Sequence, residues 1–257
     1  MDDPTDDPVD DPGQFGLETY QAFRRRALDP ALSRNEKCGF TETVRAGQSE
    51  RIFADIRTKL PALDNPGSRV LDIGAGCSDL AHHIVAATGR RGQSLSVIDS
   101  PEMLALLPDS AHLEKIAGPF PQCLASIRQA TRPFDAILAY SVAQHVFAEG
   151  DLFAFVDAAV QLLADAGRFL VGDIPNASLR RRFLASASGR ADQLARHPHS
   201  PDPGVRFNAL DVGQIDDGVV IGLLVRMRLA GLQAFVVPQG EGLPMANRRE
   251  DLLIARP

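Results

Sequence analysis

Two aspartates in this sequence occupy places where a carboxylate could hold a small ligand. Asp72 stands two residues before the first glycine of the run Gly74-Ala75-Gly76, and Asp99 ends a second apolar run 27 positions after Asp72. A carboxylate at the end of a buried strand can accept hydrogen bonds from ribose hydroxyls or from an ammonium group. Charged hydrogen bonds of this kind contribute about 1.5–3 kcal/mol each. The two residues therefore predict a site for a ligand that carries donors or positive charge.

The residue at position 79 distinguishes the glycine-rich run from a dinucleotide-binding turn. The fingerprint G-x-G-x-x-G places its third glycine where the helix approaches the pyrophosphate, and here that place is Asp79. A carboxylate there repels a diphosphate, and Asp72 adds a second negative charge nearby. The pattern favours a ligand with an ammonium group and no phosphate, which is the chemistry of S-adenosylmethionine. An NAD-dependent enzyme ranks below this interpretation.

A second set of polar side chains follows the next two apolar runs. Tyr140 and Ser141 stand at the end of one run, His145 comes shortly afterwards, and Asp173 ends the next. His145 has a reference pKa of about 6.5, which suits a general base, although it could instead bond within the fold. Asp173 could act as a base, anchor a substrate hydroxyl or cap the following helix. These two side chains are too few to predict a metal site.

The elements that must position these residues alternate along the chain. Strands are expected over 70–73, 94–99, 112–118, 134–140, 168–173, 235–237 and 252–254. Helices are expected after a cap at Ser78 or Asp79, after Ser100, and over 121–130, 151–166, 177–196 and 216–230. The helix over 151–166 is expected to end at Gly167. This alternation predicts an α/β fold with a doubly wound, mostly parallel sheet.

Three short runs together resemble the cofactor-binding motifs of a known family. Asp72-Ile73-Gly74-Ala75-Gly76, Val97-Ile98-Asp99 and Ser100-Pro101-Glu102-Met103-Leu104 are similar to the motifs of class I S-adenosylmethionine-dependent methyltransferases. The resemblance covers roughly residues 70–257. It implies a seven-stranded Rossmann-like sheet with an antiparallel last strand, S-adenosylmethionine as cofactor and S-adenosylhomocysteine as product. It also implies that N-terminal helices cover the cofactor as a lid.

The same resemblance assigns roles to individual positions. The cofactor-binding residues that it implies, together with our candidate for the methionine carboxylate, Arg45, are Asp72, Gly74, Ala75, Gly76, Asp99, Ser100, Met103, Gly118, Pro119, Phe120, Tyr140, Ser141 and Arg45. The candidate catalytic residues are His145, Asp173 and Tyr140. Ala117-Gly118-Pro119-Phe120 lacks the acid that family members often offer to the adenine, so we expect backbone near Gly118 and the ring of Phe120 to contact the base. A further departure is Ser78, where many members have a third glycine.

Composition divides the chain into three parts and limits its partners. Residues 1–13 repeat Asp-Asp-Pro and predict a disordered acidic tail. Residues 14–66 predict a helical lid, and residues 67–257 predict the cofactor-binding domain.

Residues 2–11 contain six aspartates. Without these six, the number of acidic residues equals the 27 Lys and Arg residues. A neutral domain gives no reason to expect nucleic acid as a partner. Three cysteines without a C-x-x-C pair and the lack of a long apolar run predict a cytoplasmic protein with no membrane partner.

The function expected from these observations is methyl transfer to a small-molecule acceptor, with a hydroxyl oxygen as the acceptor atom. One alternative is transfer or cyclisation of the aminocarboxypropyl part of S-adenosylmethionine, which would release methylthioadenosine. A second alternative is a protein that binds the nucleotide without catalysis. The sequence leaves open whether the protein forms a homodimer.

Overall fold

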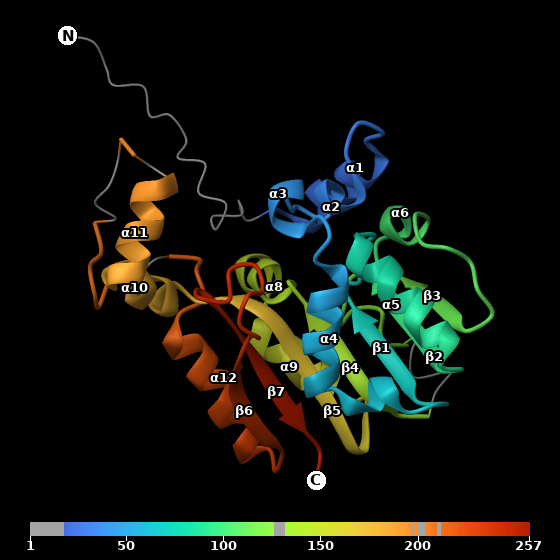
Figure 1. The fold of residues 1–257 in the computed structure, drawn as a ribbon. Coiled ribbons are helices and arrows are strands. Elements are labelled where there is room, and N and C mark those ends of the chain that lie inside the picture. The colour runs from blue at the N-terminus through green and yellow to red at the C-terminus, as the bar shows by residue number, and fades with distance from the viewer. Residues whose placement is uncertain (1–17, 126–131, 197, 200–203, 210–211) are drawn as a thin grey trace.

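A twisted seven-stranded sheet forms the centre of the molecule (Figure 1). The computed structural model describes residues 18–125, 132–196, 198–199, 204–209 and 212–257, so the predicted tail over 1–13 lies outside the described residues. The strands are β1 (Arg69–Ile73), β2 (Ser94–Asp99), β3 (Leu113–Ala117), β4 (Phe134–Tyr140), β5 (Leu163–Pro175), β6 (Gln233–Pro238) and β7 (Arg249–Ala255). Their order in the sheet is β3-β2-β1-β4-β5-β7-β6.

The direction of the strands confirms the predicted sheet. β1, β2, β3, β4 and β5 pair in parallel, and β7 runs antiparallel to both β5 and β6. The order of the strands changes direction at β1. From β1 the sheet continues through β2 and β3 on one side, and through β4 and β5 on the other. In an open sheet of this kind, ligands bind beyond the carboxyl ends of the strands at such a point.

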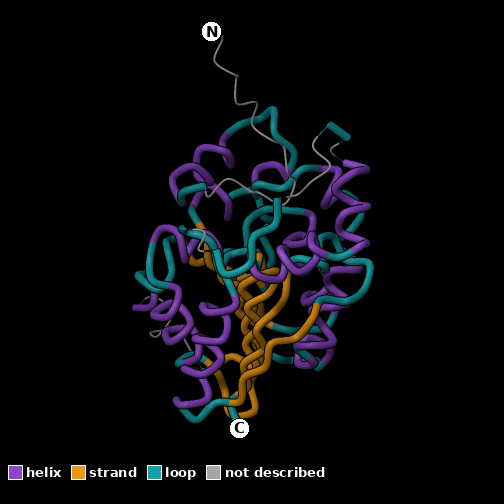
Figure 2. The backbone as a smooth tube through the Cα atoms, turned by 90° about the vertical axis from the view of Figure 1, so that its left-hand side faces the viewer, coloured by secondary structure: helices purple, strands orange, loops and turns teal. Residues whose placement is uncertain are grey.

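Helices cover both faces of the sheet because alternate strand residues point to opposite sides (Figure 2). Leu71 and Ile73 belong to the apolar cluster that contains Phe155 of α9, whereas Val70 belongs to the cluster that contains Ile56 of α4. The helices are α1 (Tyr20–Leu28), α2 (Arg34–Lys37), α3 (Glu42–Arg45), α4 (Ser49–Lys59), η1 (Pro61–Asp64), α5 (Asp79–Arg90), α6 (Pro101–Leu104), α8 (Ala143–Glu149), α9 (Leu152–Val160), α10 (Ala177–Ala185), α11 (Ala187–Arg196) and α12 (Asp217–Leu229).

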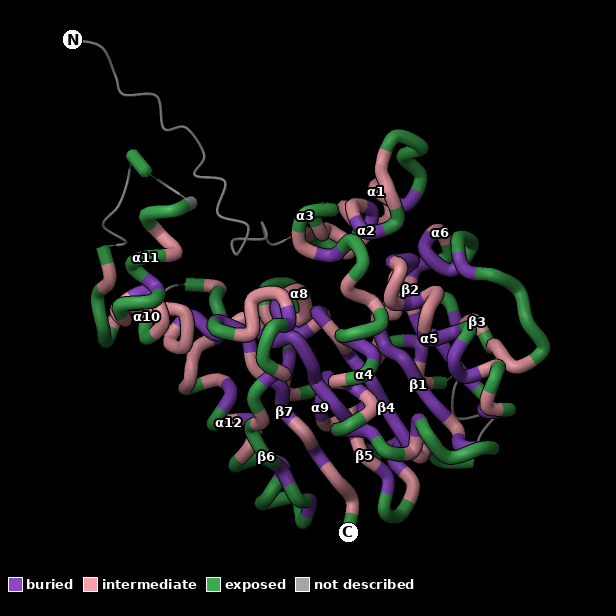
Figure 3. The backbone as a smooth tube through the Cα atoms, in the orientation of Figure 1, coloured by how far each residue is buried: buried purple, intermediate pink, exposed green. Residues whose placement is uncertain are grey.

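The N-terminal helices divide into two groups by the apolar residues that they bury, although each contains both buried and exposed residues (Figure 3). α4 buries Ile52, Phe53 and Ile56 completely, in the same apolar cluster as residues of α5. α1, α2 and α3 instead lie above the carboxyl ends of the parallel strands (Figure 1), and of their apolar residues only Ala27 is buried. We call residues 18–47 the cover.

One predicted helix is wrong over its last six residues. The helix expected over 151–166 ends at Val160, and β5 already begins at Leu163. Gly167, expected to end the helix, lies inside β5, where a Cβ atom would come within 2.9 Å of two backbone oxygens. Leu162 and Leu163 are buried in the same cluster as the helix, so the apolar spacing continued across the boundary.

The C-terminal half differs from the prediction in smaller ways. The region 177–196 forms two helices, because the chain turns at Ser186, whose backbone is extended. The helix expected over 216–230 is confirmed as α12. Among the described residues, no helix is both long enough and apolar enough to cross a membrane.

Candidate functional site

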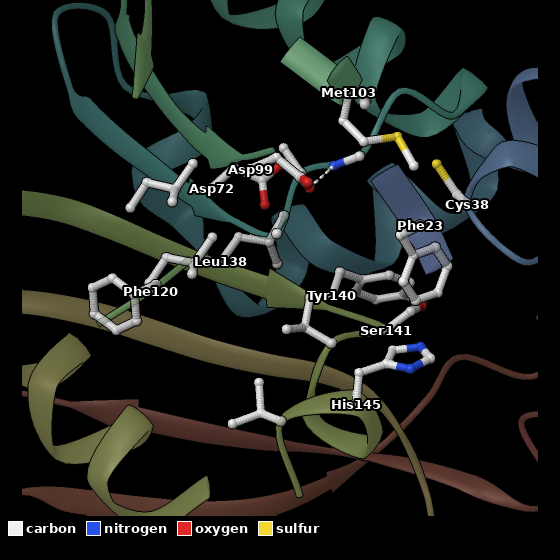
Figure 4. Close-up of a pocket in the computed structure, with 18 of the residues that line it drawn as sticks. Phe23, Cys38, Asp72, Asp99, Met103, Phe120, Leu138, Tyr140, Ser141 and His145 are labelled. Carbon is white, nitrogen blue, oxygen red and sulfur yellow. Dashed lines mark hydrogen bonds between the residues drawn. The ribbon is translucent and has the colours of Figure 1, made fainter. Parts of the chain in front are cut away.

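A cavity of about 310 Å³ lies over the carboxyl ends of β1, β2 and β4, beneath the cover (Figure 4). It brings together most of the residues that the sequence indicated. The predicted site residues that line it are Arg45, Asp72, Gly74, Ala75, Gly76, Asp99, Met103, Gly118, Pro119, Phe120, Tyr140, Ser141 and His145. Ser100 does not line it: this side chain is 1% exposed and caps α6 by accepting from the Met103 N–H.

The glycine turn after β1 forms one wall of the cavity. Gly74 has φ of +73°, and a Cβ atom there would lie 2.7 Å from a methyl carbon of Val142. Gly76 has φ of +63°, and a Cβ atom there would lie 2.7 Å from the sulfur of Cys38. Ser78 then accepts from the Ala81 N–H and starts α5, as expected. Both glycines are therefore required by conformation and by space.

Asp99 holds the glycine turn while its carboxylate faces the cavity. Its Oδ2 accepts from the Gly76 N–H at 2.8 Å, and its Oδ1 accepts from the Ser100 N–H at 2.6 Å. Burial raises the pKa of Asp99, and these two backbone bonds oppose that shift. A carboxylate oxygen can accept more than one hydrogen bond, so both oxygens remain able to accept from a ligand.

Asp72 is 4% exposed and lines the cavity next to Asp99 (Figure 4). Burial, together with the negative charge of Asp99, raises the pKa of Asp72 to about 7. Among the described residues, no hydrogen-bond donor to this carboxylate opposes the shift. A positively charged ligand group would relieve both effects, because it would favour the ionised carboxylate.

The far end of the cavity is apolar. Phe120 follows β3 and meets Phe155 edge-on, with 5.1 Å between the ring centres. Gly118 and Pro119 come between β3 and Phe120 and line the cavity, whereas Met103, which is 2% exposed, lies on the side of the cover in a cluster with Cys77, Cys38 and Phe23. A flat aromatic base would fit chemically between such groups.

His145 stands at the opposite end and contacts the cover. Its ring meets Phe23 edge-on at 4.8 Å between centres, and Nδ1 lies 3.2 Å from the Glu18 carbonyl oxygen. The Gln144 side-chain amide lies 3.3 Å from Nε2. These partners assign the Nδ1–H tautomer, in which Nε2 is the acceptor. Burial lowers the pKa of His145, so the ring is neutral near pH 7.

Arg45 reaches from α3 of the cover to the ends of β4 and β5. Its Nη2 donates to Ser141 Oγ at 3.0 Å and to Asp173 Oδ2 at 2.6 Å. The guanidinium stacks on Phe40 at 4.0 Å, and its buried Nε has no hydrogen-bond partner. This orphaned donor, on a residue that lines the cavity, fits an anionic group of a ligand.

No family model matches the sequence, and neither does any curated protein. The fold, however, matches the plantazolicin methyltransferase BpumL, solved with a substrate analogue and S-adenosylhomocysteine, with a TM-score of 0.54 and 11% identity. This alignment covers 93% of the present chain and 98% of BpumL.

Two further matches have the same architecture. The N-methyltransferase NodS from Bradyrhizobium japonicum WM9, solved with S-adenosylhomocysteine, gives a TM-score of 0.51 with 18% identity over 93% of this chain and 98% of NodS. The CurJ carbon methyltransferase gives 0.53 with 16% identity over 93% of this chain, which spans 65% of CurJ. The chain has the class I methyltransferase fold.

In this methyltransferase fold, Asp173 is placed differently from what its position suggested. It is 2% exposed and does not line the cavity. Burial alone would raise the pKa of Asp173, but the guanidinium groups of Arg249 and Arg45 hold it below its usual value. Ser141 Oγ also donates to Asp173 Oδ2, and both residues have positive φ, +62° and +59°. Asn176 caps α10 and does not line the cavity either.

A buried network of hydrogen bonds, with one ion pair, holds Asp173 in place. Gln239, in the β6–β7 connection, donates from Nε2 to Asp173 Oδ1 at 3.1 Å and to Asp251 Oδ1 at 3.2 Å. Asp251 also accepts from the Asp173 N–H and forms an ion pair with Lys59 of α4 at 2.8 Å. Sequence reasoning missed Gln239, Asp251 and Lys59 because they come from three separate elements and carry no local motif.

Sequence reasoning also missed the aromatic lining that the cover supplies. Tyr20, Phe23 and Phe40 line the cavity, and none of them is among the site residues predicted from the sequence. Leu28, at the end of α1, is 70% exposed. The cavity also contains Cys38, which gave no signal in the sequence. Over the residues that the structure describes, no group of three metal-binding side chains is present.

Proposed function

We propose that this protein binds S-adenosylmethionine and transfers its methyl group to a small-molecule hydroxyl. The observation that carries the proposal is the pair Asp72 and Asp99, which face one cavity from neighbouring strand ends. The elevated pKa of Asp72 means that burial and the charge of Asp99 disfavour two ionised carboxylates at this site. An adenosyl ligand with a positive charge and no phosphate suits this site, and a dinucleotide does not.

The residues that would hold the cofactor are distributed around the cavity. Asp99 would accept from the ribose hydroxyls, and Asp72 from the methionine ammonium. Arg45 would donate its orphaned Nε–H to the methionine carboxylate. Phe120 and Met103 would pack against the adenine. A bound sulfonium cofactor supplies an activated methyl group, so the protein needs mainly to orient the acceptor and exclude water, which can lower a barrier by up to about 7–11 kcal/mol.

His145 is our candidate for the general base. In the assigned tautomer, Nε2 would accept the proton of an acceptor hydroxyl in place of its hydrogen bond from the Gln144 amide, and the bond from Nδ1–H to the Glu18 carbonyl would orient the ring. Tyr140 would contact the acceptor as a neutral phenol, since burial, with the negative charge of Asp173, raises its pKa well above the usual value. We assign Asp173 the role of positioning Arg45 and Ser141, because its lowered pKa makes it a weak base.

The relatives by fold act on carbon, on nitrogen and on a peptide-derived product, by their names, so the fold leaves the acceptor atom open. The hydroxyl assignment rests on His145 alone. It predicts that acceptors with a hydroxyl group will be methylated and that the corresponding methyl ethers will not react further.

Calorimetric titration of the purified protein tests cofactor binding. S-adenosylmethionine and S-adenosylhomocysteine should bind, whereas NAD and ATP should not. Incubation with S-adenosylmethionine and a library of hydroxylated small molecules should then yield S-adenosylhomocysteine. Release of methylthioadenosine would instead indicate transfer of the aminocarboxypropyl part, and tight binding without any product would indicate a non-catalytic protein. Preferential binding of NAD or ATP would overturn the proposal.

A further inference from the structure

Two thiols meet where the cover touches the glycine turn. Cys38 immediately follows α2 in the cover, Cys77 follows Gly76, and their sulfur atoms lie 3.9 Å apart. Cys38 lines the cavity, and Cys77 is fully buried behind it. The third cysteine, Cys123, belongs to a different apolar cluster. All three are free thiols in the structure.

Contacts with neighbouring residues hold the two sulfur atoms close together. The Cys77 N–H donates to the Cys38 sulfur at 3.2 Å. Both cysteines belong to one small apolar cluster, which also contains Ala27 of α1 and Met103 of α6. The cover is tied down beside them by Asn35, whose amide donates to Asp79 at the start of α5 at 3.0 Å. The pair therefore stays together as long as the cover is closed.

The two thiols differ in acidity. Such a difference is expected of two cysteines that form a disulfide, in which one sulfur attacks and the other is attacked. The hydrogen bond from Cys38 lowers the pKa of Cys77, and the positive charges of Lys37 and Arg34 act in the same direction against its burial. The same contact, together with burial, raises the pKa of Cys38. Cys77 is thus the better thiolate, and Cys38 is the thiol that a small molecule in the cavity can reach.

We propose that Cys38 and Cys77 are a redox modification site, at which hydrogen peroxide forms a reversible disulfide that fastens the cover to the glycine turn. The Cys38 sulfur attacks one oxygen of the peroxide, so that an S–O bond forms and the O–O bond breaks. The product is a sulfenic acid, and the other oxygen leaves as water with the thiol proton. The Cys77 thiolate then attacks that sulfur, the S–O bond breaks, and the hydroxide leaves as a second water after taking up the Cys77 proton. The two thiols lose two electrons in total, and peroxide gains them. A small thiol reverses the reaction by exchange.

The backbone around the pair allows the sulfurs to close the remaining distance. A disulfide needs its sulfurs about 2.05 Å apart, so each must move by roughly 1 Å from the observed 3.9 Å. Gly39 follows Cys38 with φ of +81°, and Gly76 precedes Cys77 with φ of +63°. Glycines on both sides of the contact give the two short segments the freedom for this shift.

The consequence for ligands rests on the proposed function. With the cover fastened, Tyr20, Phe23 and Phe40 could not move away from the cavity, so a ligand would enter and leave slowly. Formation of the disulfide, in contrast, depends only on the geometry of the two thiols and would occur in a protein with any activity. The two statements can therefore be tested separately.

Peptide mapping tests the disulfide. The full-length Cys123→Ser protein is treated with a small excess of hydrogen peroxide, alkylated and digested with trypsin without reduction. We expect the tryptic peptides 38–45 and 70–90 to appear as one cross-linked species, which reduction separates. Peptides that remain separate, or that carry only sulfinic acid, would overturn the proposal. The Cys38→Ser and Cys77→Ser variants in the same background should give no cross-link.

Ligand exchange tests the consequence. The release of prebound S-adenosylhomocysteine should slow at least tenfold after oxidation of the Cys123→Ser protein, and reduction should restore it. A cross-linked protein that releases this ligand at the original rate would refute fastening of the cover. A cross-link in a protein that never binds S-adenosylhomocysteine would instead refute the proposed function and leave the disulfide established.

Discussion

Arg45 Nη2 lies 2.6 Å from Asp173 Oδ2, and this ion pair joins the cover to the end of β5. Both side chains are less than a tenth exposed. Arg249 reaches the same carboxylate oxygen at 2.9 Å, so one carboxylate balances two buried guanidinium groups. Loss of the carboxylate should therefore harm the fold more than loss of either arginine alone.

Replacement of this carboxylate should be strongly destabilising. Asp173→Asn preserves the shape of the side chain, and asparagine tolerates the positive φ at this position. It removes the negative charge that faces both Arg45 and Arg249, and breaking such a buried pair costs about 3–5 kcal/mol. Urea unfolding should show this loss of stability.

The variant Arg45→Gln should lose clearly less free energy of unfolding, because Arg249 still balances the charge of Asp173. Asp157→Asn, at an exposed ion pair, is the matched control and should change little.

Loss of the Asp99 carboxylate should weaken cofactor binding by more than tenfold. Asp99→Ala removes the proposed acceptor for the ribose hydroxyls, and it also frees the Gly76 N–H. Calorimetry with S-adenosylhomocysteine measures the effect. Asp109→Ala changes the net charge equally at an exposed position that faces Lys115, and its affinity should equal that of the unaltered protein. An unaltered affinity in Asp99→Ala would defeat the ribose assignment.

The elevated pKa of Asp72 should make cofactor affinity depend on pH. Below about pH 7 this carboxyl is protonated and cannot accept an ammonium ion as a charged partner. The affinity for S-adenosylmethionine should therefore increase as the pH rises from 6 to 8. Calorimetry at several pH values should show this increase in the unaltered protein and a flat profile in Asp72→Asn.

The same pKa should affect stability in the opposite sense. Because the folded pKa of Asp72 exceeds its unfolded value of 3.8, the ligand-free fold loses stability as the pH rises from about 4 through about 7. The full shift of about three pKa units corresponds to about 4 kcal/mol. At pH 8, Asp72→Asn should thus melt at a higher temperature than the unaltered protein when no ligand is present. A lower melting temperature would contradict the raised pKa.

His145 should affect turnover more than binding. His145→Gln keeps a polar side chain against Phe23 but removes the base, so turnover should fall roughly 10²-fold with little change in cofactor affinity. Since burial lowers the pKa of His145, activity in the unaltered protein should decline only below about pH 6.5. Steady-state rates across pH measure both effects. Full activity in His145→Gln would remove this residue as the base.

The sequence predicted the structure best where a few neighbouring residues determine the local conformation. Ser78 and Ser100 were indicated as helix caps and are caps, and the strand that ends at Asp99 has the predicted limits. Gly74 and Gly76 adopt the positive φ that a tight turn requires. Each of these features depends on a few adjacent residues, which is why one sequence was enough.

The sequence predicted the structure least well where contacts between distant segments of the chain determine it. The helix expected over 151–166 failed because a short apolar run fits a buried strand as well as a helix, and pairing of Leu163 with Phe134 decided between them. Asp173 was assigned to the reacting group from its strand end alone. Its pairing with Arg45, 128 positions away, removes it from the cavity wall and could not be predicted without the fold.

The seam between the cover and the sheet is largely polar, and this determines how the protein would open. Arg24 pairs with Glu102, Arg34 with Asp79 and Arg45 with Asp173, whereas the apolar cluster at the seam is small. Opening would mainly return charges to water, with little of the heat-capacity increase that exposed apolar surface brings. Ligand exchange in the reduced protein should therefore quicken with ionic strength, because dissolved ions screen the more exposed of these pairs.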